Sequence, residues 1–187
     1  MRRESSYLEL PVKRLIAALS LLVALAMQAE AQHRELDYKG IVGHAGCHAK
    51  VVTSDEHSVF ESAYDYQNHV LYVGTEPGEL PEELAIMVVL HETGHCLQDQ
   101  EGLLRMPGPR SLAENQALEL DADRRSADMA CRLGLDGRGL IIRLLEWARD
   151  AFDYYGDPGH GTLDQRMSTG RLALSCEKSQ APMLVRQ

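Results

Sequence analysis

The residue pattern changes once along the chain, near Pro81, and this change constrains the fold more than any other feature. Between Gly40 and Gly74 the segments IVGHAGCHAKVV, ESAYDY and HVLYVG are rich in Val, Tyr and His, and 54–56 (Ser-Asp-Glu) has turn composition. We expect two or three antiparallel strands there. After Pro81 the spacing becomes helical. The order predicts an α+β fold, with a small antiparallel sheet N-terminal to a helical half.

Four helices are expected in the second part of the chain. The first runs from about Pro81, with acidic residues in its first turn, to Gln100. Capping boxes predict the starts of two others, and glycines predict two ends. The second helix is expected from Ser111, whose capping box includes Glu114, to about Gly134. The third is expected from about Gly139 to Tyr155, with Gly156 as the stop. The last is expected to begin at Thr162, whose capping box includes Gln165, and to reach toward Ser175.

The first 31 residues have the pattern of a secretory signal peptide. A basic leader precedes the uncharged run Leu15 to Met27, and Ala29-Glu30-Ala31 matches an A-x-A cleavage site. The run is shorter than the ~20 residues that span a bilayer, although an uncleaved anchor is an alternative. We therefore expect a signal peptide at 1–31, a single domain at 32–187, no stable membrane insertion after cleavage, and a periplasmic or secreted protein.

Charge and cysteine content narrow the classes further. The net charge of -9 disfavours nucleic acid as a partner, because phosphate binding needs a basic face. Export into an oxidising compartment favours two disulfides among Cys47, Cys96, Cys131 and Cys176, with the pairing left open and free buried cysteines as the alternative. The sequence has no C-x-x-C pair, which disfavours a four-thiolate zinc site.

The strongest chemical signal is His91-Glu92-Thr93-Gly94-His95, the pattern H-E-x-x-H. On a helix, two residues four apart lie about 40° apart around the axis, so both imidazoles can bind one ion. Glu92 is turned by about 100° from His91 and can act as a general base toward a water on that ion. The alternative is a helix whose histidines are solvated or simply hydrogen-bonded.

A catalytic zinc needs a third protein ligand and an open position for water. Glu119 and Asp123 lie four residues apart, hence on one helix face, within Glu-Leu-Asp-Ala-Asp. We predict that Glu119 binds the metal and that Asp123 accepts the second ring N–H of a ligand histidine. An exposed acidic face paired with Arg124 and Arg125 is the alternative.

Together these residues resemble the gluzincin metallopeptidases, which combine H-E-x-x-H with a downstream glutamate ligand. His91, Glu92 and His95 match the first motif, and Glu119 with Asp123 matches the second. The E-x-x-A-D form is most similar to small soluble relatives of the CAAX prenyl endopeptidases and heat-shock membrane proteases. The resemblance implies a zincin-like fold, and 66–74 (YQNHVLYVG) is similar to the strand that runs along the substrate in that branch.

Two further candidates lie near the C-terminal helix. His160 and Arg166 resemble a histidine and an arginine of that branch, and His160 is predicted to donate to the oxyanion of the tetrahedral intermediate. A loop histidine without a catalytic role is the alternative. Asp164, in a Gly-Thr-Leu-Asp segment similar to the aspzincin motif, is the second choice for the third metal ligand.

Other histidines carry weaker signals. His44 and His48 would share one face of a strand beside Cys47, and a second metal site there is an alternative to plain solvent-facing histidines.

The expected function is that of an exported zinc-dependent endopeptidase acting on a protein or peptide. Zn²⁺ would be held by His91, His95 and Glu119, with Glu92 as general base and His160 assisting. The alternative is a catalytically inactive exported zinc-binding module, such as an inhibitor or assembly factor. Glu92 favours catalysis, because a purely structural zinc site has no use for a base.

Overall fold

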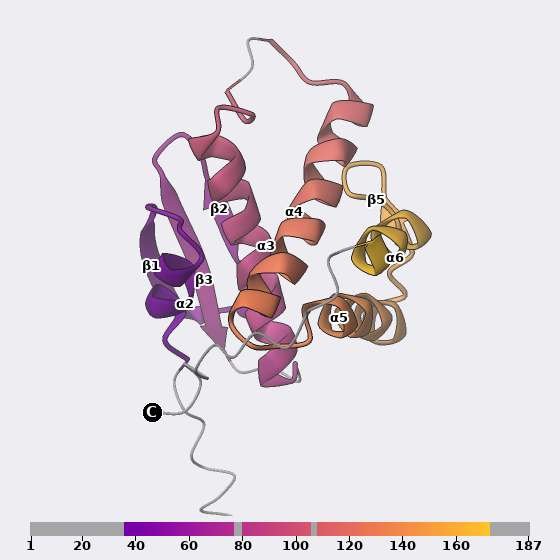
Figure 1. Cartoon of the computed structure of the whole chain (residues 1–187), viewed down its shortest axis with the longest axis horizontal. Coiled ribbons are helices and arrows are strands. Elements are labelled where there is room, and N and C mark those ends of the chain that lie inside the picture. The colour runs from indigo at the N-terminus through magenta and orange to yellow at the C-terminus, as the bar shows by residue number, and fades with distance from the viewer. Residues whose placement is uncertain (1–35, 77–79, 106–107, 173–187) are drawn as a thin grey trace, which may run out of the picture. The chain divides into compact units, whose positions relative to one another are not determined.

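The computed structural model describes residues 36–76, 80–105 and 108–172 (Figure 1). The leader expected at 1–31 lies outside these residues, as does Cys176. The elements described below belong to one compact unit that begins at Asp37. This part combines helices with small sheets, so the predicted α+β class is confirmed.

The N-terminal sheet has three strands, β1 (Lys50–Ser58), β2 (Ala63–Asp65) and β3 (Val70–Glu76), in the order β1-β3-β2. β2 pairs with β3 in the expected antiparallel sense. β1 pairs with β3 in parallel, so the prediction of a purely antiparallel sheet is wrong. The reason is topological: the chain passes through the short 3₁₀ helix η1 (Val59–Glu61) and through β2 first, and β3 then runs in the direction of β1.

Two local predictions in this region are also wrong. Residues 54–56 lie inside β1 instead of forming a turn, and most of β1 is exposed enough to carry polar side chains. Residues 40–44 belong to the helix α2 (Tyr38–His44) instead of a strand, because the Asp37 side chain accepts a hydrogen bond from the Gly40 N–H and caps the helix.

The segment expected to run along a substrate contains β3, which is the central strand. β1 occupies one of its edges and β2 the other. β3 therefore has no free edge for another strand, and β2 is an edge strand of this sheet.

The predicted helices are confirmed as α3 (Glu82–Gln100), α4 (Leu112–Arg132), α5 (Gly137–Phe152) and α6 (Leu163–Leu172). Both capping boxes form: Ser111 with Glu114 at α4, and Thr162 with Gln165 at α6. α5 ends at Phe152, with Asp153 as its left-handed C-cap, so the expected end at Tyr155 with Gly156 as the stop is wrong. A two-stranded antiparallel pair, β4 (Gly156–Asp157) and β5 (Gly161–Thr162), separates α5 from α6, so not every strand precedes the helices.

α3 lies between the sheet and α4 (Figure 1) and also contacts α2, η1 and α5. It is therefore buried on nearly every side, and its residues form the centre of the core together with apolar residues of β3, α4 and α5. The most deeply buried large side chains include Leu71, Met87, Leu90, Met129, Ile141 and Leu145. This packing places H-E-x-x-H in the middle of the fold.

A disulfide between Cys47 and Cys96 joins the segment after α2 to α3. Cys131 is disulfide-bonded as well, and none of the described cysteines is free, in agreement with the expectation from sequence. Within residues 36–172, as far as the structure describes them, no helix is both long and apolar enough to cross a membrane.

Candidate metal centre

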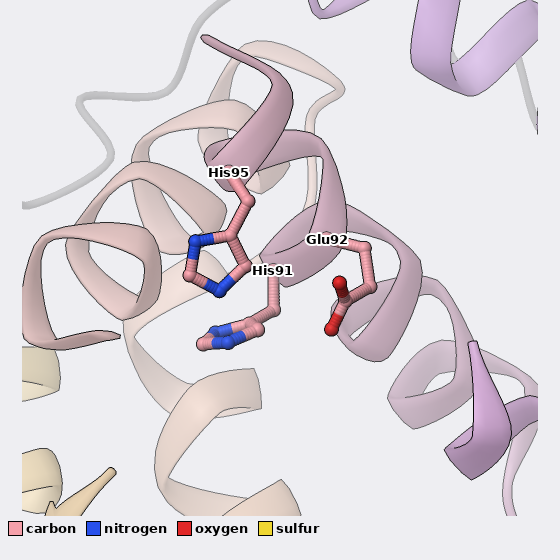
Figure 2. Close-up of side chains that lie close together, drawn as sticks. All are labelled: His91, Glu92 and His95. Carbon is pink, nitrogen blue, oxygen red and sulfur yellow. The ribbon is translucent and has the colours of Figure 1, made fainter. Parts of the chain in front are cut away.

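α3 presents His91, Glu92 and His95 as the helical spacing predicts. Figure 2 shows the two imidazoles close together and the Glu92 carboxylate projecting beside them from the same helix. The ring centroids of His91 and His95 are 4.9 Å apart. One potential ligand atom from each of the three residues lies within 4.8 Å of the others.

Glu119 reaches the two histidines from α4. Its Oε2 lies 3.1 Å from His91 Nε2 and 3.4 Å from His95 Nε2. Ligands that bind zinc tetrahedrally at ~2.0–2.1 Å are separated from one another by about 3.3 Å. The two distances from Glu119 Oε2 are close to this separation, so the structure brings Glu119 together with His91 and His95, as predicted from sequence.

Gly94 explains how α4 comes so close to α3. A Cβ atom at this position would lie 3.1 Å from the Ala122 Cα and 3.2 Å from its carbonyl oxygen. Even an alanine here would require Ala122 of α4 to shift by a few tenths of an ångström, so a glycine suits this position between the two imidazoles.

Asp123 holds His91 in the predicted manner. Its Oδ1 lies 2.9 Å from His91 Nδ1, so an N–H at Nδ1 donates to the carboxylate and Nε2 remains the ligand atom. The Asp123 side chain is fully buried, and Arg166 donates to both of its oxygens at 2.7 Å. Arg166 thus has a role that sequence left open: it neutralises a buried carboxylate that positions a metal ligand.

The charges in this cluster shift one another's pKa values. Burial would raise the pKa of Asp123, but hydrogen bonds from Arg166 and His91 lower it to about 2. Burial would lower the pKa of His91, but hydrogen bonds to Asp123 and Glu119 raise it to about 10. Hydrogen bonds from both histidines hold the Glu119 pKa well below its usual range despite burial. Metal ligands bind in their deprotonated form, so metal binding at His91 Nε2 competes with its hydrogen bond to Glu119.

Gln98 is a functional residue that the sequence analysis missed. Its Nε2 donates to the Leu118 carbonyl at 2.7 Å and to Asp121 Oδ2 at 3.0 Å. Both partners can only accept, which fixes the amide orientation and leaves Oε1 to accept from His95 Nδ1 at 2.9 Å. His95 is thereby held with Nε2 free for a metal. The signal in the sequence was a glutamine three residues after the second histidine, on the same helix face.

Glu92 faces a different environment. Its Oε2 accepts a hydrogen bond from the Tyr64 backbone N–H of β2 at 2.9 Å. The residue is partly exposed and lines a cavity of about 310 Å³ together with His91. A carboxylate in this position can reach a molecule in the cavity, as a general base requires.

The wall of this cavity is largely apolar, and α3 and α5 supply several of its apolar residues. They include Val88, one turn before Glu92, and Leu144, Leu145 and Ala148. Phe60 of η1 and Phe152 of α5 also line it, and their rings pack with Trp147 in one aromatic cluster with centroids 5.0–5.8 Å apart.

His160 also lines the cavity, as predicted for a residue near the site. Its Nε2 lies 3.6 Å from Glu119 Oε2, and its Nδ1 lies 2.8 Å from Asp157 Oδ2. About half of the side chain is exposed. The Asp157 carboxylate orients the ring with Nε2 toward the site, where it can donate to a bound ligand.

The remaining candidates do not join the site. Asp164 is exposed at the start of α6, and the hydrogen bonds of His91 and His95 go to Glu119, Asp123 and Gln98 instead. His44 lies in α2 and bonds to the Gly40 carbonyl, while Cys47 is in a disulfide. Among the described residues, the H-E-x-x-H group is the one cluster with metal-binding geometry, which leaves no support for a second site at His44 and His48.

Comparisons with protein families, with curated proteins and with solved structures find no match to this chain. The function must therefore be argued from the residues of the site.

Proposed function

We propose that this chain is an exported zinc-dependent endopeptidase with a zincin-like fold. The observation that carries the proposal is the position of the Glu119 carboxylate, at zinc-ligand separation from both Nε2 atoms, beside a Glu92 carboxylate that faces an open cavity. A site built only to hold a structural ion closes all four positions with protein ligands. Here the side of the site toward the cavity remains accessible.

His91, His95 and Glu119 would hold the zinc ion, which when bound supplies a Lewis acid and lowers the pKa of a water. Glu92 takes the proton from the attacking water and returns it to the leaving amine. His160, held by Asp157, donates from Nε2 to the developing oxyanion. Asp123 and Gln98 keep the two imidazoles in the tautomer that leaves Nε2 for the metal.

The cavity beside Glu92 supports a polypeptide with an apolar side chain near the cleaved bond as the substrate. Its wall is largely apolar, and its volume of about 310 Å³ is at the lower limit of small-molecule pockets. The prenylated substrates of the membrane-bound proteins that the motifs resemble are not part of the proposal.

Export is supported by the basic and apolar leader in the sequence and by the disulfide between Cys47 and Cys96. The alternative of an inactive zinc-binding module shares all of these features. Glu92 separates the two, because only an enzyme uses it.

The test combines metal analysis with proteolysis of fluorescein-labelled casein by the purified protein. We expect one zinc ion per chain and slow cleavage of casein. The variant Glu92→Gln should keep the zinc while cleavage falls by ~10²–10⁴-fold, as for loss of a general base. Zinc without cleavage of casein or of a random peptide library would favour the inactive module. A protein that binds no zinc would exclude both functions.

A further inference from the structure

Tyr64 of β2 binds two points on α3 at once. Its backbone N–H donates to Glu92 Oε2 at 2.9 Å, and its hydroxyl donates to Asp99 Oδ2 at 2.7 Å. Glu92 and Asp99 are seven residues apart, close to two turns, and so lie on the same face of α3. One residue of the sheet therefore spans two turns of the metal-binding helix.

The Asp99 end of this contact is fixed. The Asp99 side chain has no exposed surface, and Arg105 Nε donates to its Oδ1 at 2.7 Å. His69 Nδ1 lies 3.0 Å from Asp99 Oδ2. The Arg105 guanidinium holds the Asp99 pKa below its usual range, while burial and the Asp99 carboxylate raise that of the Tyr64 hydroxyl. Tyr64 thus stays the donor and Asp99 the acceptor.

The Glu92 end depends on this contact. β2 is three residues long and pairs with β3 alone, so its ladder constrains it weakly. Among the described residues, Tyr64 is the one that donates a hydrogen bond to Glu92. The bond uses Oε2, which leaves Oε1 of the carboxylate for a molecule in the cavity.

We propose that Tyr64 is a positioning residue for Glu92: its side chain anchors β2 on Asp99, and its backbone N–H then holds the Glu92 carboxylate toward the cavity. This inference rests on the proposed function for the role of Glu92 as the base. The hydrogen-bonded arrangement itself can be tested without any activity.

The first experiment measures amide hydrogen exchange of the purified protein by nuclear magnetic resonance. In Tyr64→Phe, which lacks only the hydroxyl, exchange at the residue-64 amide should be about 10-fold faster than in the wild type. Glu92→Ala, which removes the acceptor, should accelerate the same amide. Tyr66→Phe is the matched control, because Tyr66 is exposed and follows the same strand.

The amide of Leu90, in the buried centre of α3, reports global unfolding. Faster exchange of the residue-64 amide, with the exchange rate of the Leu90 amide unchanged, supports the proposal that Tyr64 positions Glu92 locally. Equal acceleration of both amides, or no change in Tyr64→Phe beyond that in Tyr66→Phe, would overturn the proposal.

The second experiment separates positioning from substrate binding with fluorescein-labelled casein. Tyr64→Phe should lower kcat roughly 10-fold, because the base is misplaced, while KM and zinc content stay at wild-type values. A raised KM at unchanged kcat would instead assign Tyr64 to substrate binding and overturn the proposal. If the wild type cleaves neither casein nor a random peptide library, the peptidase function fails, and the exchange experiment still decides whether Tyr64 holds Glu92.

Discussion

On the side of α3 that packs against α4, which we call the ligand side, His91, His95 and Gln98 each bond to fixed polar partners. On the side toward β2 and the cavity, the base side, Glu92 meets one backbone N–H and Val88 lines an apolar wall. The histidines proposed to hold an ion are thus oriented by fixed partners, whereas the carboxylate proposed to move a proton keeps one oxygen unoccupied. Substitutions on the two sides should therefore affect different quantities.

The largest effect is expected for Glu119→Gln, on the ligand side. Loss of the anionic ligand should lower zinc affinity by more than ~100-fold, the upper limit for residues that merely support a ligand. Competition with a chromophoric chelator measures this. Asp164→Asn is the control, because Asp164 is exposed and the hydrogen bonds of His91 and His95 go to other residues. If the Asp164 substitution removed the zinc and Glu119→Gln did not, the ligand set would be wrong.

Acid pH should destabilise the ligand side through Asp123. Its pKa is lowered from 3.8 to about 2, so its contribution is complete above pH 4 and is lost as the pH falls through 2. The shift corresponds to about 2 kcal/mol of unfolding free energy in the metal-free protein. Urea unfolding between pH 5 and pH 2 measures it. In Asp123→Asn the pH dependence should be weaker by this amount, and an unchanged dependence would assign the effect to other groups.

Gln98→Met tests whether the Gln98 amide is needed to orient His95 on the ligand side. It keeps the length of the side chain but cannot accept from His95 Nδ1, so zinc affinity should fall roughly 10-fold, as for other supporting residues. Gln67→Met, at an exposed turn, should leave the affinity unchanged. Wild-type affinity in the Gln98 variant would mean that His95 needs no orienting partner.

The smallest effect is expected on the base side. Ala148→Leu adds volume to the cavity wall and should raise KM for casein about fivefold without changing zinc affinity. Ala151→Leu on the exposed face of the same helix is the matched control. A loss of zinc in Ala148→Leu would show that the two sides of α3 are coupled.

The ligand side could be predicted from sequence because its signals are local. Once α3 forms, its two histidines four residues apart lie on one face. The capping box at Ser111 starts α4, and the spacing of Glu119 and Asp123 then puts both carboxylates on one face of that helix. Arg166 and His160 were singled out from their place near the C-terminal helix. In the structure Arg166 bonds to Asp123 and His160 bonds to Asp157. Asp164 was the second choice, and its exposed position does not support it as a ligand.

The base side could not be predicted, because it depends on pairings between distant segments. The parallel register of β1 with β3 has no local signature, and it decides that β2 becomes an edge strand next to α3. The contact of Tyr64 with both Glu92 and Asp99 follows from that placement. The helix α2 was predicted as a strand because valine and histidine outweighed the capping signal of Asp37.

The disulfide at Cys96 has a consequence for motion. Cys96 follows His95 directly, and its disulfide with Cys47 ties α3 to the segment after α2. α4 and β2 contact the same helix as well. α3 is therefore a stationary wall of the cavity. Phe152, which also lines the cavity, is 63% exposed and precedes the left-handed Asp153. In the proposed peptidase, the exposed Phe152 ring could rotate within nanoseconds to admit a substrate, while His91 and His95 stay in place on α3.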